Sequence, residues 1–269
     1  MTKFEIRGPS GLGDAIYVNP IAQAFSRMYD KVLVRTKYPE VFKYCKKVET
    51  VPFKKGGADK EFNYGGKRRE DQSTSQWQDL LITSGLSMNT PYVIEWRLTN
   101  RQLEKMINDN AENKKILIMS SPHVPFARLD KFGLELIPNW KKFIPLLEYA
   151  KDNGYFIIQA GKGKCLWDYG KLIDIDLTNK TTVCDIMDLG IIGDVFLGQP
   201  GFIVPLAEGN GKNLYLIFSR RGLNCNTEFL KNITGKKVCS TRRGFWGVDD
   251  FTDEKLVESF RKCLLTMNN

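Results

Sequence analysis

Apolar residues along this chain recur in short blocks that alternate between the spacing of β-strands and the spacing of α-helices. Near the N-terminus, the apolar-rich segment 4–7 predicts a strand that runs into the glycine-rich turn 8–13. Apolar residues then follow a helical spacing from Asp14 onward, and segment 31–35 (KVLVR) predicts the next strand. A strand, a glycine turn, a helix and a strand in this order indicate the opening of a parallel α/β sheet.

The remainder of the N-terminal half is less regular. Pro20 lies inside the helical pattern, where it either kinks the helix or begins its main part with Asn19 as the N-cap. Segment 54–75 is rich in glycine and charged residues, which predicts a long exposed loop. Further predicted elements are a strand over 62–64, a helix over 75–86, a strand over 92–96 and a helix that opens with the capping-box pair Thr99 and Gln102.

A second α/β pattern begins at Lys115, after a polar stretch near Asn110. Its predicted strands cover 115–121, 155–161, 172–177, 194–198 and 213–219, and its helices cover 139–153, 183–190, 202–209 and 253–265. We therefore predict two doubly wound, Rossmann-like α/β domains that face a cleft. The expected bounds are 1–112 for the N-terminal, acceptor-binding domain and 113–252 for the C-terminal, donor-binding domain, with a terminal helix over 253–269 that can pack back on the N-terminal domain.

Composition places few limits on the partners of this protein. Of 269 residues, 42% are apolar and 26% charged, as is typical of a globular domain. No apolar run approaches the roughly 20 residues that span a bilayer, and the N-terminus lacks a secretory signal. We therefore expect a cytoplasmic protein, in the host cytoplasm if viral, without stable membrane insertion. The net charge of +9 fits either a polyanionic partner or merely a basic surface.

Cysteine and histidine offer little for metal binding. The six cysteines are scattered and form no CxxC pair, which favours reduced packing thiols over a zinc site. His123 is the only histidine, so a catalytic triad or a multi-histidine site would have to be built around it. We expect no metal site.

The sharpest local feature is the loop that contains Gly11 and Gly13 and ends in Asp14. It lacks the GK[ST] of a P-loop, and its carboxylate would repel a phosphate, so the spacing suits a positioned carboxylate better than a phosphate cradle. A carboxylate in this place can accept the proton of an attacking hydroxyl. The alternative interpretation is that Asp14 only caps the helix.

Several strand ends in the C-terminal half are candidates for binding a nucleotide diphosphate. Backbone amides at the start of a helix can bind phosphate oxygens, and hydroxyl or cationic side chains can assist. For each of them, an ordinary solvated turn is the alternative interpretation. The candidate donor-binding residues are Ser120, Ser121, Gly161, Lys162, Thr182, Gln199, Pro200, Gly201 and Arg220.

Taken together, these segments resemble the heptosyltransferase-like family of glycosyltransferases, which have the B-type two-domain fold. The likeness lies in segment 6–25 (IRGPSGLGDAIYVNPIAQAF), in the strand–helix–strand over 116–161 and in segment 175–209. The sequence departs from the family pattern at the turn Gln199–Gly201, which no histidine follows, and the chain is short for the family.

The resemblance implies an inverting, metal-independent displacement in which Asp14 is the catalytic base. It implies no cofactor, and a nucleotide-sugar donor that we expect to be UDP-linked. The leaving diphosphate would be stabilised by backbone amides near Gly201 and by cations of the C-terminal domain.

Three interpretations of the function remain open, two of which differ in the acceptor. Segment 63–81 resembles compact bacteriophage glycosyltransferases, which favours the 5-hydroxymethyl group of a modified pyrimidine in double-stranded phage DNA. In that case Trp77 would stack on a flipped base and Lys67, Arg68 and Arg69 would contact phosphates, while Gly11 and Gly13 would line the acceptor site. A lipopolysaccharide or other saccharide acceptor is the alternative. A non-catalytic nucleotide-binding protein is the second alternative.

Overall fold

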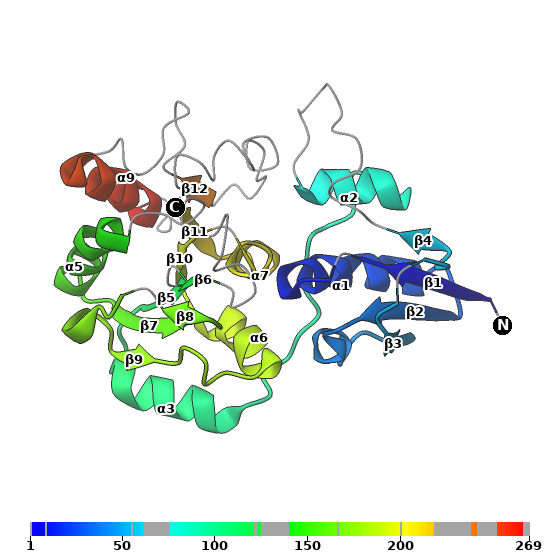
Figure 1. The fold of residues 1–269 in the computed structure, drawn as a ribbon, viewed down its shortest axis with the longest axis horizontal. Coiled ribbons are helices and arrows are strands. Elements are labelled where there is room, and N and C mark those ends of the chain that lie inside the picture. Colours follow the sequence, from blue (N-terminus) through cyan, green and yellow to red (C-terminus); the bar gives the residue numbers. More distant parts are fainter. Residues whose placement is uncertain are drawn as a thin grey trace.

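The chain forms two α/β halves, each built on its own parallel sheet (Figure 1). The computed structural model describes residues 2–8, 10–54, 56–61, 76–120, 123–124, 140–165, 167–199, 201–217, 238–240 and 252–265. The two halves meet where helix α1 (Leu12–Ser26) contacts helix α7 (Ile203–Gly209). The two-domain α/β architecture expected from the sequence is confirmed.

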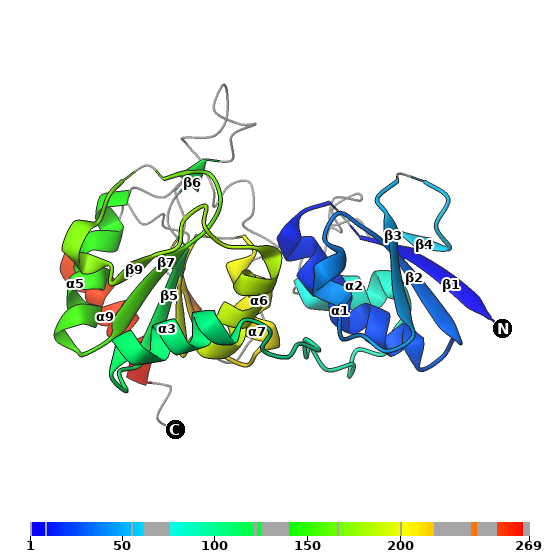
Figure 2. The same ribbon diagram turned by 90° about the horizontal axis from the view of Figure 1, so that it is seen from below.

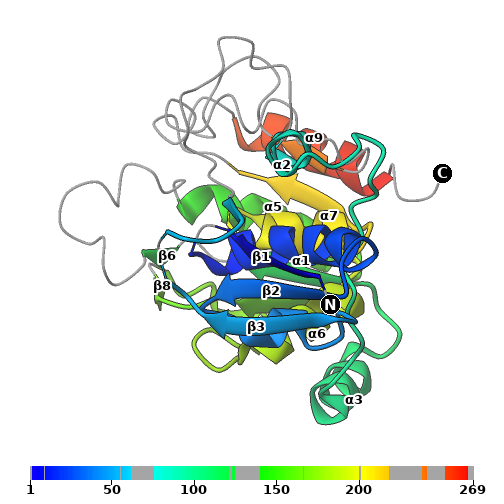
Figure 3. The same cartoon turned by 90° about the vertical axis from the view of Figure 1, so that its right-hand side faces the viewer.

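The N-terminal sheet has four parallel strands in the order β3-β2-β1-β4. These strands are β1 (Lys3–Arg7), β2 (Lys31–Thr36), β3 (Val48–Pro52) and β4 (Lys60–Glu61). Figure 3 shows β1, β2 and β3 side by side, with α1 packed along them. Helix α2 (Gln76–Ser84) and the short 3-10 helix η1 (Pro39–Phe42) complete this half. The strands over 4–7 and 31–35 are confirmed, β3 was not predicted, and segment 62–64 lies outside the described residues.

Pro20 neither ends nor restarts the first helix, because α1 runs through it without a break. Asn19 is therefore not an N-cap, contrary to one of the two expectations. Its side chain is buried, and its amide nitrogen donates to the Val41 carbonyl oxygen at 2.7 Å. Proline removes a backbone donor from a helix interior, and burial of Pro20 in the core offsets this loss.

The C-terminal sheet has six parallel strands in the order β12-β11-β10-β5-β7-β9. These strands are β5 (Ile116–Ser120), β7 (Phe156–Ala160), β9 (Ile175–Asp176), β10 (Val195–Gly198), β11 (Asn213–Leu216) and β12 (Val238–Ser240). Read from β9, the chain order is that of a doubly wound Rossmann sheet, with its switch point between β5 and β10. A separate antiparallel pair joins β6 (His123–Val124) to β8 (Lys164–Cys165).

Helices cover both faces of this sheet. They are α5 (Ile144–Asp152), which follows the 3-10 turn η3 (Trp140–Phe143), α6 (Val183–Ile192), α7, and α9 (Asp253–Leu265), with a 3-10 turn η4 (Gly170–Leu172). All four predicted helices of the C-terminal half are present. No helix that the structure describes has both the length and the apolar character to cross a membrane.

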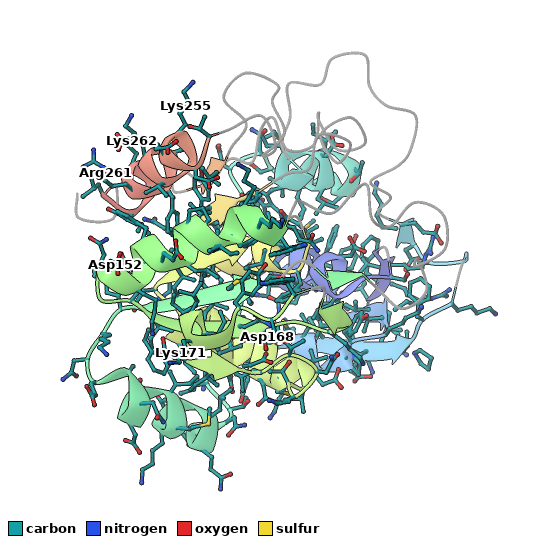
Figure 4. The ribbon with its side chains drawn as sticks, turned by 60° about the vertical axis from the view of Figure 1, so that its left-hand side comes forward. Asp152, Asp168, Lys171, Lys255, Arg261 and Lys262 are labelled. Atoms are coloured by element: carbon teal, nitrogen blue, oxygen red, sulfur yellow. The ribbon has the colours of Figure 1, made fainter. Side chains whose placement is uncertain are left out.

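The terminal helix does not pack on the N-terminal half as the sequence allowed. Helix α9 packs against α5, β11 and β12, because its apolar face completes the second core. Phe260 lies fully buried there, with its ring 5.2 Å from that of Tyr215. Figure 4 shows Lys255, Arg261 and Lys262 on the opposite side of α9, pointing outward.

Helix α3 (Arg101–Ala111) packs against α6 and lies beneath the C-terminal half (Figure 1 and Figure 2). Its N-cap is Asn100, whose side-chain oxygen accepts from the Leu103 amide at 3.0 Å, and not Thr99 as expected. The boundary at residue 112 stays a prediction, and this packing favours an earlier boundary, in the extended segment before Asn100.

The predicted strand over 92–96 is not a strand. Its side chains alternate between buried and exposed as in a strand, but its partners are loop and helix groups of both halves, such as Asn19, which accepts from the Glu95 amide at 3.1 Å. The Ile94 amide donates to the Gly209 carbonyl at 3.3 Å, and the Trp96 indole donates to Asp188 at 2.7 Å. The alternation thus comes from a linker pressed between two domains.

Candidate active site

The two halves contact each other closely at two glycine-rich turns. The first follows β1 and leads into α1, and the second follows β10 and leads into α7. A Cβ atom placed on Gly13 would lie 3.2 Å from the Phe202 Cα atom and 3.6 Å from the Gly201 carbonyl carbon. Only glycine allows the two backbones to approach this closely without a shift. Gly13 thus makes room for the other domain, and its expected place in an acceptor site stays a prediction.

Asp14 lies in the first turn of α1, one residue from this contact. Its Oδ2 atom accepts a hydrogen bond from the Gly11 amide at 2.8 Å. A Cβ on Gly11 would lie 2.8 Å from that same oxygen, so glycine at 11 allows the carboxylate to fold back on the loop. Burial raises the pKa of Asp14, and the Gly11 hydrogen bond lowers it by a smaller amount. The group is thus a partly desolvated carboxylate whose proton affinity exceeds that of an ordinary aspartate.

Gly13→Ala tests the contact between the turns. The added methyl should displace the second turn by a few tenths of an ångström, given the 3.2 Å approach. We expect the turnover rate to fall by about threefold to tenfold, because a 1 Å misplacement costs about 10²-fold. The free energy of unfolding should change by less than about 1 kcal/mol, since alanine also improves the helix.

The control for this variant is Ser26→Ala, at the opposite end of α1, which should leave the turnover rate unchanged. Gly13→Val adds more volume at the same point and should lower the rate further. A Gly13→Val protein that turns over at the wild-type rate would show that the contact has no bearing on catalysis.

The described donor candidates Ser120, Gly161, Gln199 and Gly201 lie along the carboxyl edge of the C-terminal sheet. Ser120 ends β5 beside Gly198 at the end of β10, in register, which is the switch point where ligands of doubly wound sheets bind. Gln199 and Gly201 follow β10 directly, and Gly161 follows β7 at the same edge. The structure therefore brings these strand ends together, and it adds Phe202, whose backbone contacts Gly13.

A bracing residue that the sequence did not reveal is Asn179. Its side chain binds the Gly163 amide and carbonyl at 2.9 and 2.8 Å, and its own amide donates to the Gly161 carbonyl at 2.9 Å. Asn179 has a positive φ of 61°, which asparagine tolerates better than most residues. The loop 161–163 thus has a fixed shape, with Lys162 exposed on it.

Thr182 is the N-cap of α6, as predicted. Its hydroxyl donates to the Asp185 carboxylate at 2.8 Å and accepts from the Asp185 amide at 3.2 Å, in a capping box. This exposed residue therefore has a structural role, and its donor-binding role stays a prediction. The candidates Ser121, Pro200, Arg220, Lys67, Arg68 and Arg69 lie outside the described residues.

Trp77 does not fit the role of a stacking platform for a base. Its side chain is 8% exposed and belongs to the N-terminal core. Its indole nitrogen donates to the Thr90 carbonyl at 3.3 Å, and its ring lies 4.7 Å from that of Tyr92. The predicted helix is present and contains Trp77, but the side chain lies on the buried face of that helix.

The carboxyl edge of the N-terminal sheet has positive charge and an aromatic ring, which sequence reasoning missed. Arg7, at the end of β1, forms an ion pair with Glu61, at the end of β4. The Arg7 guanidinium and the Lys37 ammonium lie 5.7 and 5.5 Å from the centre of the Phe53 ring. The only hint in the sequence is that each of these residues ends or follows a strand. An acceptor that binds here would lie beside the loop of Asp14.

A second residue that sequence reasoning missed joins the halves at some distance from Asp14. The fully buried Asp188 of α6 accepts hydrogen bonds from the Trp96 indole, from the Thr99 amide and hydroxyl, and from the Asn100 amide, at 2.7 to 3.1 Å. The hint was an aspartate within an otherwise apolar stretch of helix. This carboxylate fixes the interdomain linker on the C-terminal half.

The described segments offer neither a metal-binding cluster nor a reactive thiol at Cys45. Within those segments, no group of three or more His, Cys, Asp or Glu side chains could hold a metal ion. Cys45, Cys184 and Cys263 are free thiols, and burial raises the pKa of Cys45 to about 12. Cys45 is therefore a packing residue and not a nucleophile.

Neither a protein-family model nor a curated protein matches the sequence. Solved structures do resemble the fold. The structure of E. coli ADP-heptose LPS heptosyltransferase II matches with a TM-score of 0.67 and 12% identity, over 100% of both chains. A glycosyl transferase of family 9 from Veillonella parvula matches with a TM-score of 0.65 and 10% identity, over 98% of this chain and 97% of that chain.

E. coli heptosyltransferase WaaC with ADP is also similar, over 98% of each chain, with a TM-score of 0.56 and 10% identity. At such identities the likeness concerns the fold. The likeness extends over both halves of the chain. The chain therefore has the two-domain, B-type fold of the heptosyltransferase-like glycosyltransferases.

Proposed function

We propose that this protein transfers a sugar from a nucleotide-sugar donor to a hydroxyl group of a saccharide acceptor. One observation supports this most strongly. Asp14, a partly desolvated carboxylate, directly follows Gly13, and the Gly13 backbone contacts the turn at the switch point of the other domain, where a nucleotide would bind. A base next to a diphosphate site is what a direct displacement needs.

The proposed reaction is a single displacement. Asp14 accepts the proton of the acceptor hydroxyl while that oxygen attacks the anomeric carbon of the donor. The bond from the anomeric carbon to the diphosphate oxygen breaks, and the nucleoside diphosphate leaves with the electron pair. Backbone amides of the turn that includes Gly201, and the cation Lys162 on the neighbouring loop, would offset its charge. Attack opposite the leaving group inverts the anomeric centre.

A saccharide acceptor is better supported than DNA. Of the residues to which the DNA interpretation gives a role, Trp77 is buried, and residues 67–69 lie outside the described segments. The similar structures are named for a lipopolysaccharide heptosyltransferase and for a heptosyltransferase with ADP, so an ADP-linked donor takes precedence over the UDP-linked donor expected from the sequence. A cytoplasmic site of action stays a prediction.

A transfer assay tests the proposal and separates the alternatives. Purified protein is mixed with ADP- and UDP-linked sugars and with either lipopolysaccharide core oligosaccharide or duplex DNA containing 5-hydroxymethylpyrimidines. Products are weighed by mass spectrometry, and donor binding is measured by calorimetry. We expect a sugar-sized mass gain on the oligosaccharide. A gain on DNA alone would restore the DNA acceptor, and absence of both transfer and donor binding would overturn the assignment as a glycosyltransferase.

A further inference from the structure

Two tyrosines link α1, the helix that contains Asp14, to α7. Helix α7 follows the turn after β10 that includes Gln199 and Gly201, which we call the donor turn. Tyr17 lies in α1, about one turn after Asp14, and is 3% exposed. Its hydroxyl donates to the Glu208 carboxylate of α7 at 3.0 Å. The hydroxyl of Tyr92, from the interdomain linker, donates to the Pro205 carbonyl of α7 at 2.8 Å. Each hydrogen bond therefore crosses from the N-terminal half or the linker to the same short helix.

The two rings also contact each other and the rest of the N-terminal core. Their centres are 5.2 Å apart in a stacked arrangement, and the Trp77 ring lies 4.7 Å from that of Tyr92. Aromatic pairs at such distances add to the stability of their contact. Packing alone would be satisfied by phenylalanine at both positions, so the hydroxyls contribute directed contacts that packing does not supply.

These contacts define the position of α7 relative to α1 at both of its ends. At the start of α7, the Phe202 backbone lies against Gly13. At its end, Glu208 binds Tyr17, and Gly209 lies against Ile94 with its carbonyl oxygen bound by the Ile94 amide. The start of α7 thus lies at the start of α1, next to Asp14, and the end of α7 lies beside Tyr17, about one turn further along α1.

We propose that Tyr17 and Tyr92 are positioning residues that set the distance from the Asp14 carboxylate to a donor bound at the turn before α7. Neither side chain reaches the reacting atoms, and both act through α7 and α1. This assignment rests on the proposed glycosyl transfer. Its physical basis is that catalytic groups must be held to within about 0.5 Å of their productive geometry. The two hydroxyls bind α7, which follows the donor turn, to α1, which contains Asp14, and to the linker.

Tyr17→Phe, Tyr92→Phe and the double variant test the assignment, because each removes a hydroxyl and keeps the ring. We expect kcat to fall about tenfold in each single variant, in line with a displacement below 1 Å. The affinity for ADP, measured by calorimetry, and the KM for the donor should stay within about twofold, because the donor turn itself is intact. Glu208→Gln keeps an acceptor oxygen for Tyr17 and should retain more activity than Glu208→Ala.

The matched control is Tyr29→Phe, since Tyr29 stacks on Phe4 at 4.4 Å within the same half and far from α7. It should leave kcat and KM unchanged. Wild-type kcat in the double variant would overturn the positioning role, and so would a loss of ADP affinity equal to the loss of kcat. If the wild-type protein transfers no sugar from any donor, the proposed function itself is overturned. This result is distinguishable from failure of the positioning role, because it is seen in the wild type before any variant is compared.

Discussion

Asp14→Asn should lower the rate of sugar transfer about 10²- to 10⁴-fold, the usual contribution of a general base. Asparagine keeps the size of the side chain and an oxygen that can accept from the Gly11 amide, so the loop should hold its shape. It cannot accept a proton at neutral pH. Binding of ADP should stay close to the wild-type value, because Asp14 belongs to the acceptor side of the junction. Rates are measured by release of nucleoside diphosphate in the presence of acceptor.

The same variant should be no less stable than the wild type at neutral pH. Burial raises the pKa of Asp14 above its unfolded value. The unfolded chain therefore loses this proton at lower pH than the folded chain does, and the contribution of Asp14 to stability is full below its unfolded pKa and declines as pH rises through its folded pKa. Asparagine has no such decline. Urea unfolding at pH 4 to 8 should therefore show a difference in favour of Asp14→Asn that grows as pH rises and levels off once the folded carboxyl is ionised.

Two results would count against this interpretation of Asp14. A variant that transfers sugar at the wild-type rate would leave Asp14 as a helix cap only, the alternative that the sequence already allowed. A variant that is much less stable at every pH would mean that the carboxylate is structural. Asp109→Asn, at an exposed position of α3, is the control for the loss of one negative charge.

Local patterns along the chain were sufficient to predict most elements, and the reason is physical. Buried parallel strands such as β5 and β7 consist of consecutive apolar residues, and the capping box at Thr182 and Asp185 marks the start of α6. The loop of Asp14 was also recognisable, because a glycine turn between a strand and a helix places its residues at the carboxyl edge of the sheet. Strand β3 escaped notice because none of its side chains is fully buried, so no apolar run marks it.

Contacts between the halves were beyond the reach of such patterns. Segment 92–96 alternates as a strand does, yet its backbone pairs with Gly209 and its Trp96 with Asp188. The period of burial says which side chains are covered and not by what. The same limit applies to Gly13, whose close contact with the Phe202 backbone of the other half no local pattern indicates. Helix α9 showed a similar ambiguity, because its apolar face would fit either half.

Asp188→Ala should lower the free energy of unfolding by about 3 to 5 kcal/mol, because it removes a charged acceptor and leaves several buried donors without a partner. The donors affected are the Trp96 indole, the Thr99 amide and hydroxyl, and the Asn100 amide. Asp188→Asn should have a smaller effect, since one acceptor oxygen remains while the new amide hydrogens face donors. Asp109→Ala is the control, because that side chain is exposed.

The position of Asp188 also determines how unfolding should proceed. It joins the linker, and with it the N-terminal half, to α6 of the C-terminal half, so its loss should weaken the coupling between the two. We expect the urea transition of Asp188→Ala, followed by tryptophan fluorescence, to broaden or to separate into two steps, which lowers the apparent m-value. A transition as steep as that of the wild type, with stability within about 0.5 kcal/mol, would mean that water replaces the carboxylate. The Asp188 hydrogen bonds would then contribute nothing to the coupling between the halves. The Tyr17 and Tyr92 contacts would then be what holds the two halves in register.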